Sequence, residues 1–402
     1  MSFSTSLSGV NAAQQTMDVV SNNIVNAGTI GFKKGETEFA EIYASSLQDS
    51  GQSSGQGVAL TTIRSDFSQG EFSFTTSALD LAIDGSGMFV LSDGDETLYT
   101  RAGSFRIDGE GFVVTTNGAR VQGFQPDNDG VITPAIGDLQ ISLALMQPKA
   151  TDQVVFSGNL DTRTEDALTP FSAGDTDTYN FSTSTTIYDS TGTPHQLDIY
   201  FAKAAEPDGT YNVYATIDGE VQPESASMTF DGTGALTAGS DQQLDILGFT
   251  PLGADPQTFT IDLAATSGLG ADSSTETLSQ NGFKPGEVVS FEFDDTGTVY
   301  AQYTNGEIRA MGQLLLANFI NPSALSPAGN TQYRESEGSG LAVTGRPSTG
   351  SRGYIRPSAL EVSNVDITQE LLALIEAQRN FQSSAQAIQN EDEMSQSILN
   401  IL

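Results

Sequence analysis

Few residues in this chain could do chemistry. His195 is the only histidine among 402 residues, and there is no cysteine. A Ser-His-Asp triad needs a positioned imidazole base, and protein zinc sites usually need several imidazole or thiolate ligands. The missing cysteine also removes disulfides and thiol nucleophiles. His195 follows Gly192-Thr193-Pro194 and precedes an alternating segment, so we predict that it is a turn residue.

Two short segments resemble ligand-binding loops but lack essential parts. Gly85-Ser86-Gly87 has neither the third glycine nor the following helix of a dinucleotide site. Asp127-Asn128-Asp129-Gly130 resembles part of an EF-hand loop, but Gln125 takes the first ligand position and Ile136 the twelfth. Both segments are predicted to be turns. We therefore expect no enzyme activity, no cofactor and no metal site.

The charge balance excludes two classes of partner. The chain carries 51 Asp and Glu against 16 Lys and Arg, a formal net charge of −35. Such a surface repels nucleic acid and anionic membranes, so the acidity mainly indicates solubility. The apolar stretch near Leu314–Ile320 is too short to insert into a membrane. Residues 1–30 lack the features of a cleaved signal peptide, so any export would use another route.

The N-terminal segment has the heptad spacing of an assembling helix. Phe3, Val10, Met17 and Ile24 recur every seventh residue, with Ala13, Val20 and Ala27 at the second seam position. The predicted helix covers about 35 Å at 1.5 Å per residue and stops near Gly28. Its predicted assembly residues are Phe3, Leu7, Val10, Met17, Val20 and Ile24.

A second amphipathic helix is predicted at the other end of the chain. Asp366 and Gln369 form a capping-box pattern at its start, and its length would be roughly 50 Å. Its predicted assembly residues are Leu371, Leu374, Phe381, Ala385 and Ile388, with Ile398, Leu399 and Leu402 beyond. Neither thin stripe can be buried by its own helix. The two helices must pair with each other or with neighbouring subunits, and the pattern leaves both possibilities open.

Between these helices the pattern is almost entirely β. Alternating segments such as Leu197–Phe201, Tyr211–Ile217 and Phe259–Leu263 predict half-buried strands. The only cations between 151 and 281 are Arg163 and Lys203, whereas the flanking β segments hold most of the arginines. We predict a mainly β protein with long terminal α-helices and discontinuous, nested domains. The expected parts are a helical domain (1–32 and 362–402), a linker or extended arm (33–70, with Ser46–Gly57 rich in Ser, Gly and Gln), a β core (71–149 and 282–361) and an inserted β domain (150–281).

The chain ends also resemble a known family. The segments 8–13 and 18–33, with Asn22, Asn23, Asn26, Gly31 and Phe32, resemble the N-terminal signature of bacterial flagellar rod and hook proteins. Asn364, Asp366, Gln378 and Arg379 lie in segments that resemble the C-terminal signature. Residues 79–85 and 99–105 look like the shared β core, and 281–286 like the return from the insert. Val25, where the motif usually has Ala, is a mild departure.

The resemblance implies a structural role. Rod subunits are shorter and lack a large insert, so the length points to a hook subunit. A hook subunit would be exported through the flagellar type III apparatus and would polymerise into a short, curved extracellular tube, a universal joint. Its partners would be other copies of itself, the hook cap protein, the distal rod protein and the hook–filament junction protein. The alternatives are a rod subunit of the same family and a secreted β-rich adhesin.

Overall fold

The chain forms two compact units. The computed structural model describes residues 3–42, 57–94, 96–127, 130–167, 170–207 and 209–399, without the side chains of 398 and 399. The terminal unit comprises Met1–Ser142, Ser290–Ala301 and Ile308–Leu402, and the inserted unit comprises Leu143–Val289 and Gln302–Glu307. The predicted boundaries of the inserted domain, 150 and 281, fall inside the inserted unit. The predicted positions 46–56, Asn128, Asp129 and Leu402 lie outside the described residues.

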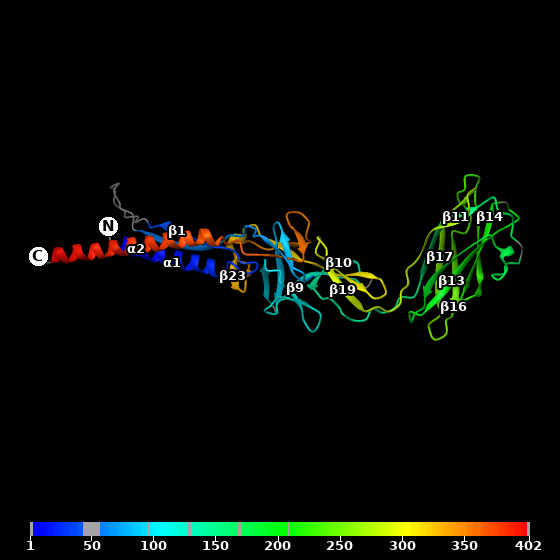
Figure 1. Ribbon diagram of the computed structural model, residues 1–402, viewed down its shortest axis with the longest axis horizontal. Coiled ribbons are helices and arrows are strands. Elements are labelled where there is room, and N and C mark those ends of the chain that lie inside the picture. The colour runs from blue at the N-terminus through cyan, green and yellow to red at the C-terminus, as the bar shows by residue number, and fades with distance from the viewer. Residues whose placement is uncertain are drawn as a thin grey trace. The chain divides into compact units, whose positions relative to one another are not determined.

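The two helices of the terminal unit pack as an antiparallel pair. Helix α1 (Phe3–Val25) and helix α2 (Ile367–Leu399) lie side by side in Figure 1. Asn23 contacts Glu370 at one end, and Gly9 lies against Ser384 near the other. The buried apolar residues of the pair, Ala13, Val20 and Ala377, are small or β-branched, so the helices can approach closely. Of the two possibilities that the sequence left open, the two helices do pair within one chain, although the contact buries only part of each helix.

Local hydrogen bonds explain where the helices begin and end. Asp366 Oδ1 accepts hydrogen bonds from the backbone N–H groups of Thr368 (2.8 Å) and Gln369 (3.2 Å), which makes Asp366 the N-cap of α2. At the end of α1, the side chain of Asn26 donates to the Asn22 carbonyl at 2.9 Å. The Asn22 carbonyl also accepts from the Asn26 backbone N–H at 3.1 Å, so both bonds tie Asn26 to the last turn. Helix α1 stops at Val25, before the predicted end near Gly28.

A β-hairpin occupies part of the segment for which the sequence predicts a linker or extended arm. Strands β1 (Gly35–Glu41) and β2 (Val58–Ser65) pair in antiparallel fashion, with Gly35 opposite Ser65. Arg64 bridges Glu36 and Glu38 across the pair. The two strands satisfy each other's backbone groups, and both contact α1.

The β core of the terminal unit is closed by strands from both sides of the insertion. Its 13-stranded sheet follows the path β19-β20-β21-β9-β5-β6-β24-β23, with β7, β8, β10, β22 and β25 attached beside it. β21 pairs with β9, and β22 pairs with β5. The bounds before the insertion are β3 (Phe72–Phe74), β4 (Leu81–Asp84), β5 (Met88–Asp93), β6 (Glu96–Thr100), β7 (Arg106–Ile107), β8 (Val113–Val114), β9 (Arg120–Pro126) and β10 (Ile132–Asp138).

The strands after the insertion complete this core. Their bounds are β19 (Val288–Phe293), β20 (Thr298–Tyr303), β21 (Ile308–Leu314), β22 (Leu316–Asn318), β23 (Ser326–Gly329), β24 (Gln332–Arg334), β25 (Val343–Gly345), β26 (Tyr354–Pro357) and β27 (Ala359–Glu361). β26 pairs with β4, and β27 pairs with β3. Phe89, Val121, Leu314 and Ile355 share one fully buried cluster, so the two halves of the sequence form a single hydrophobic core.

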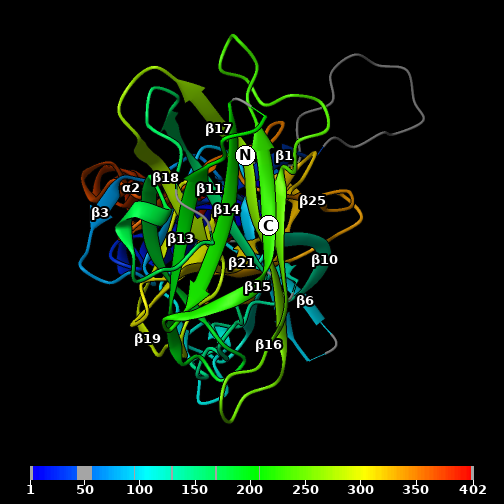
Figure 2. The same cartoon turned by 90° about the vertical axis from the view of Figure 1, so that its right-hand side faces the viewer.

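The inserted unit is a sandwich of two four-stranded sheets, most of whose strands are labelled in Figure 2. One sheet has the order β16-β17-β11-β18, in which β11 and β17 are parallel, and the other is antiparallel with the order β12-β13-β14-β15. Buried residues of both sheets, among them Phe156, Phe201, Tyr211 and Ile261, form one core. The bounds are β11 (Gln153–Asp161), β12 (Phe181–Tyr188), β13 (Pro194–Lys203), β14 (Thr210–Ile217), β15 (Glu220–Thr229), β16 (Gln243–Phe249), β17 (Gln257–Leu269) and β18 (Ser274–Gln280).

These elements confirm the predicted fold class, mainly β with long terminal helices. The alternating segments lie in β13, β14 and β17, so a period of two identified these strands correctly. A turn follows Phe293, where Gly297 N–H donates to the Asp294 carbonyl at 3.1 Å.

The two strands that lead into and out of the sandwich pair with each other. Lys149 N–H donates to Phe283 O at 3.1 Å, and Phe283 N–H donates to Lys149 O at 2.9 Å. Lys149 and Phe283, which flank the sandwich in the sequence, therefore lie side by side. Their ends can be joined by a short turn when the sandwich is deleted.

We predict that deleting residues 150–282 and joining Lys149 to Phe283 through Asn-Gly leaves the terminal unit folded, because a two-residue Asn-Gly turn suits a paired hairpin. Peptide-resolved hydrogen exchange in urea should give the terminal unit the same unfolding midpoint as in the full chain. As a control, deleting only 153–161 removes a central strand and should unfold the sandwich. A terminal unit that unfolds in the 150–282 deletion would contradict the independence of the two units.

Candidate functional site

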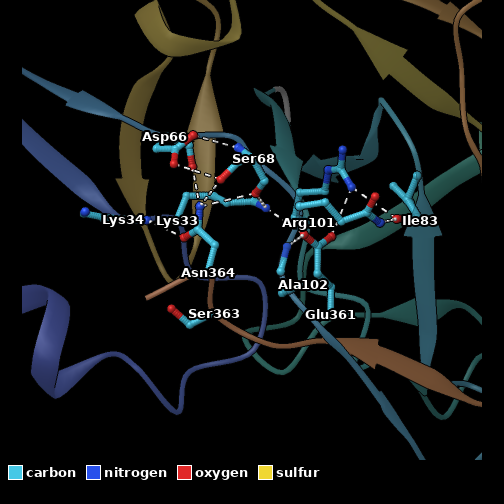
Figure 3. A network of polar contacts seen from close by, with 12 residues as sticks. Lys33, Lys34, Asp66, Ser68, Ile83, Arg101, Ala102, Glu361, Ser363 and Asn364 are labelled. Carbon is cyan, nitrogen blue, oxygen red and sulfur yellow. Dashed lines mark hydrogen bonds and ion pairs between the residues drawn. The ribbon is translucent and has the colours of Figure 1, made fainter. Parts of the chain in front are cut away.

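A buried carboxylate joins three distant parts of the terminal unit. Glu361, the last residue of β27, has a fully buried side chain. Its Oε1 accepts hydrogen bonds from Lys33 Nζ at 2.6 Å and from Gly70 N–H at 3.0 Å, and its Oε2 accepts one from Arg101 Nη1 at 3.0 Å. Figure 3 shows these groups around the Glu361 carboxylate. The end of the N-terminal signature, the β core and the approach to α2 therefore meet at one residue.

The two cations of this network use backbone carbonyls as their other acceptors. Lys33 Nζ also donates to Ser68 O at 2.7 Å, and Arg101 donates to Ile83 O (3.2 Å) and Gly85 O (2.7 Å). Burial lowers the pKa of the Lys33 ammonium, and the charge of Glu361 offsets part of this effect. Burial lowers the pKa of Arg101 in the same way. Because both cations are held away from water, they depend on the single carboxylate.

Two asparagines of the family signatures bind backbone as a neighbouring strand would. Asn23 in α1 accepts from Gly35 N–H and donates to Gly35 O, both at 2.9 Å, and donates to Glu370 Oε2 at 3.0 Å. Asn364 accepts from Lys34 N–H at 2.8 Å and donates to Asp66 O at 2.9 Å. These side chains connect the helix pair to the start and end of the β1–β2 hairpin.

Lys34 adds a second link between the hairpin and α2. Its Nζ lies 3.1 Å from Glu370 and 3.7 Å from Glu36. Burial acts to lower the pKa of Lys34, but the hydrogen bond and charge of Glu370 outweigh it, and the pKa is raised. The ammonium therefore stays charged throughout the physiological range.

Gly31 lets the chain pass close to the β core after α1. Its φ of +69° lies in the left-handed region, and a Cβ at this position would be 2.4 Å from the Ala102 nitrogen. Its N–H donates to Glu361 O at 2.8 Å. A larger residue would push the N-terminal signature away from Glu361.

Nearby, Asn22, Asn26 and Phe32 line a neutral cavity of about 860 Å³ together with strand residues.

The predicted assembly residues divide into two groups in the structure. Val20 is buried, and Val10, Met17, Ile24, Leu374, Phe381, Ala385 and Ile388 are half-buried. Phe3, Leu7 and Leu371 are exposed. The sequence prediction missed Ala377, which is buried beside the exposed Gln378, because the α2 seam follows the line through Glu370 and Ala377.

An apolar face of α2 remains uncovered in the single chain. Ile367, Leu371, Leu372 and Ile375 lie within about two turns, and their exposed fractions run from 46% at Leu371 to 64% at Leu372. Gln378 and Arg379 continue this side of α2, exposed and without a hydrogen bond or ion pair to any described residue. On α1, Phe3 and Leu7 are exposed as well. We call Ile367, Leu371, Leu372 and Ile375 the α2 apolar face.

His195 has a structural setting that differs from the predicted turn. It is the second residue of β13, where its Nδ1 lies 2.6 Å from Asp218 Oδ2 and its Nε2 lies 3.4 Å from Asp189 Oδ2. Its ring packs edge-on against Phe249. The prediction was wrong because the strand begins at Pro194, one residue earlier. His195 links two turns of the sandwich through their aspartates.

Metal sites and membrane-spanning helices are both absent from the described part of the chain. No group of three or more His, Asp or Glu residues there is arranged to hold a metal ion. No described helix is long and apolar enough to cross a membrane. Glu361 and its partners form an internal clamp, and α2 presents an exposed helical surface.

Comparison with known families places these parts in one context. Residues 3–33 match the flagella basal body rod protein family, and 356–401 match the flagellar basal body rod FlgEFG protein C-terminal family. Residues 82–155 match the flagellar hook protein FlgE/F/G D1 domain, and 159–283 match the flagellar basal body protein FlaE D2 domain. The four matches follow the order of the elements described above.

Relatives of the whole chain identify the family. The flagellar hook protein FlgE of Escherichia coli K12 is 34% identical over 411 residues, and that of Salmonella typhimurium LT2 is 35% identical over 413; both alignments cover 100% of both chains. The chain belongs to the flagellar hook protein family. The Borreliella burgdorferi hook protein is 31% identical over 98% of each chain. The crystal structure of Helicobacter pylori flagellar hook protein FlgE2 shares the fold, with a TM-score of 0.57 and 16% identity over 72% of this chain and 100% of that one.

The residues of the two family signatures fall into two groups by their position in the structure. Asn23, Gly31 and Asn364 contact other parts of the terminal unit, and the exposed Asp366 caps α2. Asn22, Gln378 and Arg379 are exposed. The comparisons do not favour the adhesin alternative. Sequence reasoning did not assign roles to Lys33, Arg101 or Glu361; the only signal was a charged residue at the end of the apolar strand 359–361.

We predict that Glu361→Gln destabilises the terminal unit of this hook protein by about 3–5 kcal/mol, because Lys33 and Arg101 would stay buried without a counter-charge. Peptide-resolved hydrogen exchange in urea can follow the terminal and inserted units separately. The matched control, Glu38→Gln, removes an exposed pair with Arg64 and should change the stability by less than about 0.5 kcal/mol. Equal midpoints for Glu361→Gln and the parent would show that the clamp is unimportant.

Acid stability of the inserted unit should depend on Asp189. Burial acts to raise its pKa, but hydrogen bonds from Thr191, Thr193 and His195 outweigh burial and lower the pKa below 3.8. A lowered pKa means that the ionised carboxylate stabilises the unit above about pH 4, and that this contribution is lost as the pH falls through the folded-state pKa. Asp189→Asn should cost about 1–3 kcal/mol at pH 7 and flatten the loss of stability below pH 4. The exposed control Asp255→Asn should keep the parental slope in pH-dependent thermal unfolding, and a parental slope in Asp189→Asn would contradict the assignment.

Proposed function

We propose that this chain is a structural subunit that polymerises into the flagellar hook, a short curved tube that transmits motor torque from rod to filament, and that it has no catalytic activity. The observation that carries the proposal is the α2 apolar face. A long helix clamped to a folded unit presents Leu371, Leu372 and Ile375 without cover from the described residues of its own chain. In the polymer, another copy would cover this face.

Energetics favour an intermolecular role for this face. Burying one Leu or Ile side chain completely contributes about 1.5–3 kcal/mol. The helix pair itself buries mainly small residues, so much of its apolar surface is unused inside the chain. In a polymer the same contact recurs in every subunit. Modest burial per subunit is therefore sufficient for cooperative assembly.

Geometry also favours an open polymer over a closed dimer. A helical tube needs an interface between two different surfaces of the same chain, related by a rotation that does not close. The exposed residues of α1 and α2 differ in sequence and lie on one fixed pair, so a copy can offer one helix to a neighbour and keep the other for a second neighbour. The exposed Gln378 and Arg379 of α2 would add polar contacts at the same surface.

The family context supplies the partners and the location in this proposal. The chain spans the full length of the Escherichia coli and Salmonella hook proteins. We infer that it contacts the distal rod protein below, the hook cap protein during assembly and the hook–filament junction protein above. Its location would be extracellular, in the hook of the flagellum, after export through the flagellar type III apparatus without a cleaved signal.

We predict that Leu371→Ser combined with Ile375→Ser raises the critical concentration for tube formation at least tenfold, because each about 1.4 kcal/mol of lost burial is a factor of ten. Both side chains are exposed in the single chain, so its circular dichroism and unfolding midpoint should not change. Sedimentation and electron microscopy of the purified protein measure the polymer.

The matched control is Gln389→Ala, an exposed polar position further along α2, which should assemble like the parent. Phe381→Ala serves as a second comparison, because Phe381 is half-buried in the single chain and its loss should weaken both the helix pair and assembly. Unchanged assembly of the Leu371 and Ile375 double variant would refute the proposed interface.

A further inference from the structure

A groove of about 420 Å³ on the terminal unit is lined by two arginines. It lies among β20, β21, the β9–β10 turn and the segment after β25. Arg309 belongs to β21, and Arg346 follows β25. The rest of the lining is uncharged, so two guanidinium groups dominate its electrostatic character. We call this feature the arginine groove; its other main lining residues are Ile132, Tyr300, Ile308 and Gln313.

The fold holds both arginines in place. The stem of Arg309 crosses Gly130, where a Cβ would lie 2.8 Å from Arg309 Cγ, so a side chain at this position would displace the arginine. Arg346 donates to Ile132 O at 3.3 Å and lies over the Phe124 ring, 5.2 Å from its centre. Arg352 donates to Arg346 O at 3.0 Å and braces this segment. The groove is therefore preorganised, which reduces the entropy lost on binding.

Neither groove arginine forms an ion pair with a described carboxylate. Most arginines in this acidic chain do: Arg64, Arg101, Arg120, Arg163, Arg334 and Arg356 all have one within 4 Å. In a protein with a net charge of −35, carboxylates are the most abundant counter-ions. The groove therefore presents two guanidinium groups that have no carboxylate partner among the described residues.

The inserted unit carries the complementary charge. Its only cations between 151 and 281 are Arg163 and Lys203, and each is already paired, with Asp161 and Asp166 respectively. The carboxylates on β16 and β17, such as Asp245 and Asp262, have no cation beside them among the described residues. Every copy therefore carries a basic groove on one unit and an acidic surface on the other.

We propose that the arginine groove binds exposed carboxylates of the inserted unit of a second copy. The proposal rests on the proposed polymer, because a contact between two different surfaces of one chain generates an open assembly. Arginine suits this role since its planar fork binds a carboxylate through two parallel hydrogen bonds. This contact is separate from the α2 apolar face, and its directional hydrogen bonds would fix how neighbouring copies are aligned.

Removing both guanidiniums tests the proposal. Arg309→Ala with Arg346→Ala should raise the critical concentration about tenfold at 0.1 M salt. The difference from the parent should shrink at 1 M salt, where the Debye length falls from about 10 Å to about 3 Å. Arg309→Lys with Arg346→Lys keeps the charge but loses the bidentate fork, so its critical concentration should lie between those of the parent and the double alanine variant.

The control is Arg106→Ala, which removes one guanidinium from an exposed position of the same unit and is compared with the single variants Arg309→Ala and Arg346→Ala. Arg106 donates only to the Thr116 carbonyl and is not part of the groove. It should leave the critical concentration and its salt dependence unchanged. If Arg106→Ala weakens assembly as much as the groove variants, net charge is responsible and the proposal is overturned.

A zero-length cross-link identifies the partner directly. Carbodiimide joins an amine to a carboxylate only when the two are in contact, so R346K supplies the amine within the groove. In tubes grown from mixed ¹⁴N and ¹⁵N copies, mass spectrometry should find the substituted position joined to a carboxylate between 143 and 289 of a different copy. Cross-links found only within one copy, or none to this range, overturn the proposal.

The outcomes separate this inference from the function on which it rests. If the parent chain forms no tubes, the proposed function fails. If the parent forms tubes and the double alanine variant forms them at the same concentration and with the same salt dependence, only the groove inference fails. Saturable binding of inorganic phosphate to the parent monomer, lost in the double alanine variant, would identify a small-anion site and would also overturn the inference.

Discussion

The terminal unit depends on one buried carboxylate. Glu361 binds Lys33 and Arg101, which lie 328 and 260 residues away in the sequence. A carboxylate and two cations out of water are stable only when all three are in place, so this clamp tolerates no partial assembly of the unit. The N-terminal signature, the β core and the start of α2 must arrive together. A chain interrupted by a large inserted sandwich can still bring its two ends into a fixed relation.

That fixed relation explains how thin helices can serve as an assembly surface. α1 and α2 bury few large side chains against each other, and an isolated pair of this kind would be marginal. Asn23, Lys34 and Glu370 connect the pair to the hairpin beside the clamp. The helices are thereby oriented by polar contacts at their base, and their apolar residues remain free for other copies. The polar residues at the base fix the orientation of the helices, and the exposed apolar residues of α2 provide the surface for contact with other copies.

The sequence predicted what local periodicity controls. Strands such as β13 and β14 follow a period of two, and both helices were found near their true bounds because caps and heptads are local signals. The Lys33–Glu361 contact has no local signal, since its partners are brought together only by the complete fold. Ala377 was missed because a small residue contributes little to an apolar pattern although it packs closely. The β1–β2 hairpin was missed because its two strands are separated by a long segment rich in Ser, Gly and Gln instead of a short turn motif.

A joint that bends while loaded needs contacts that survive small displacements. A radial gap of 0.5–1 Å forfeits about a quarter to a half of a dispersion contact. Moving two charges from 4 to 5 Å apart weakens their interaction by only about a fifth. Apolar contacts therefore suit the clamped helices, where neighbours keep one geometry, and charged contacts suit surfaces that must shift. In the proposed contact, the groove arginines Arg309 and Arg346 and the carboxylates of the inserted unit follow this division, because they pair across surfaces that must shift.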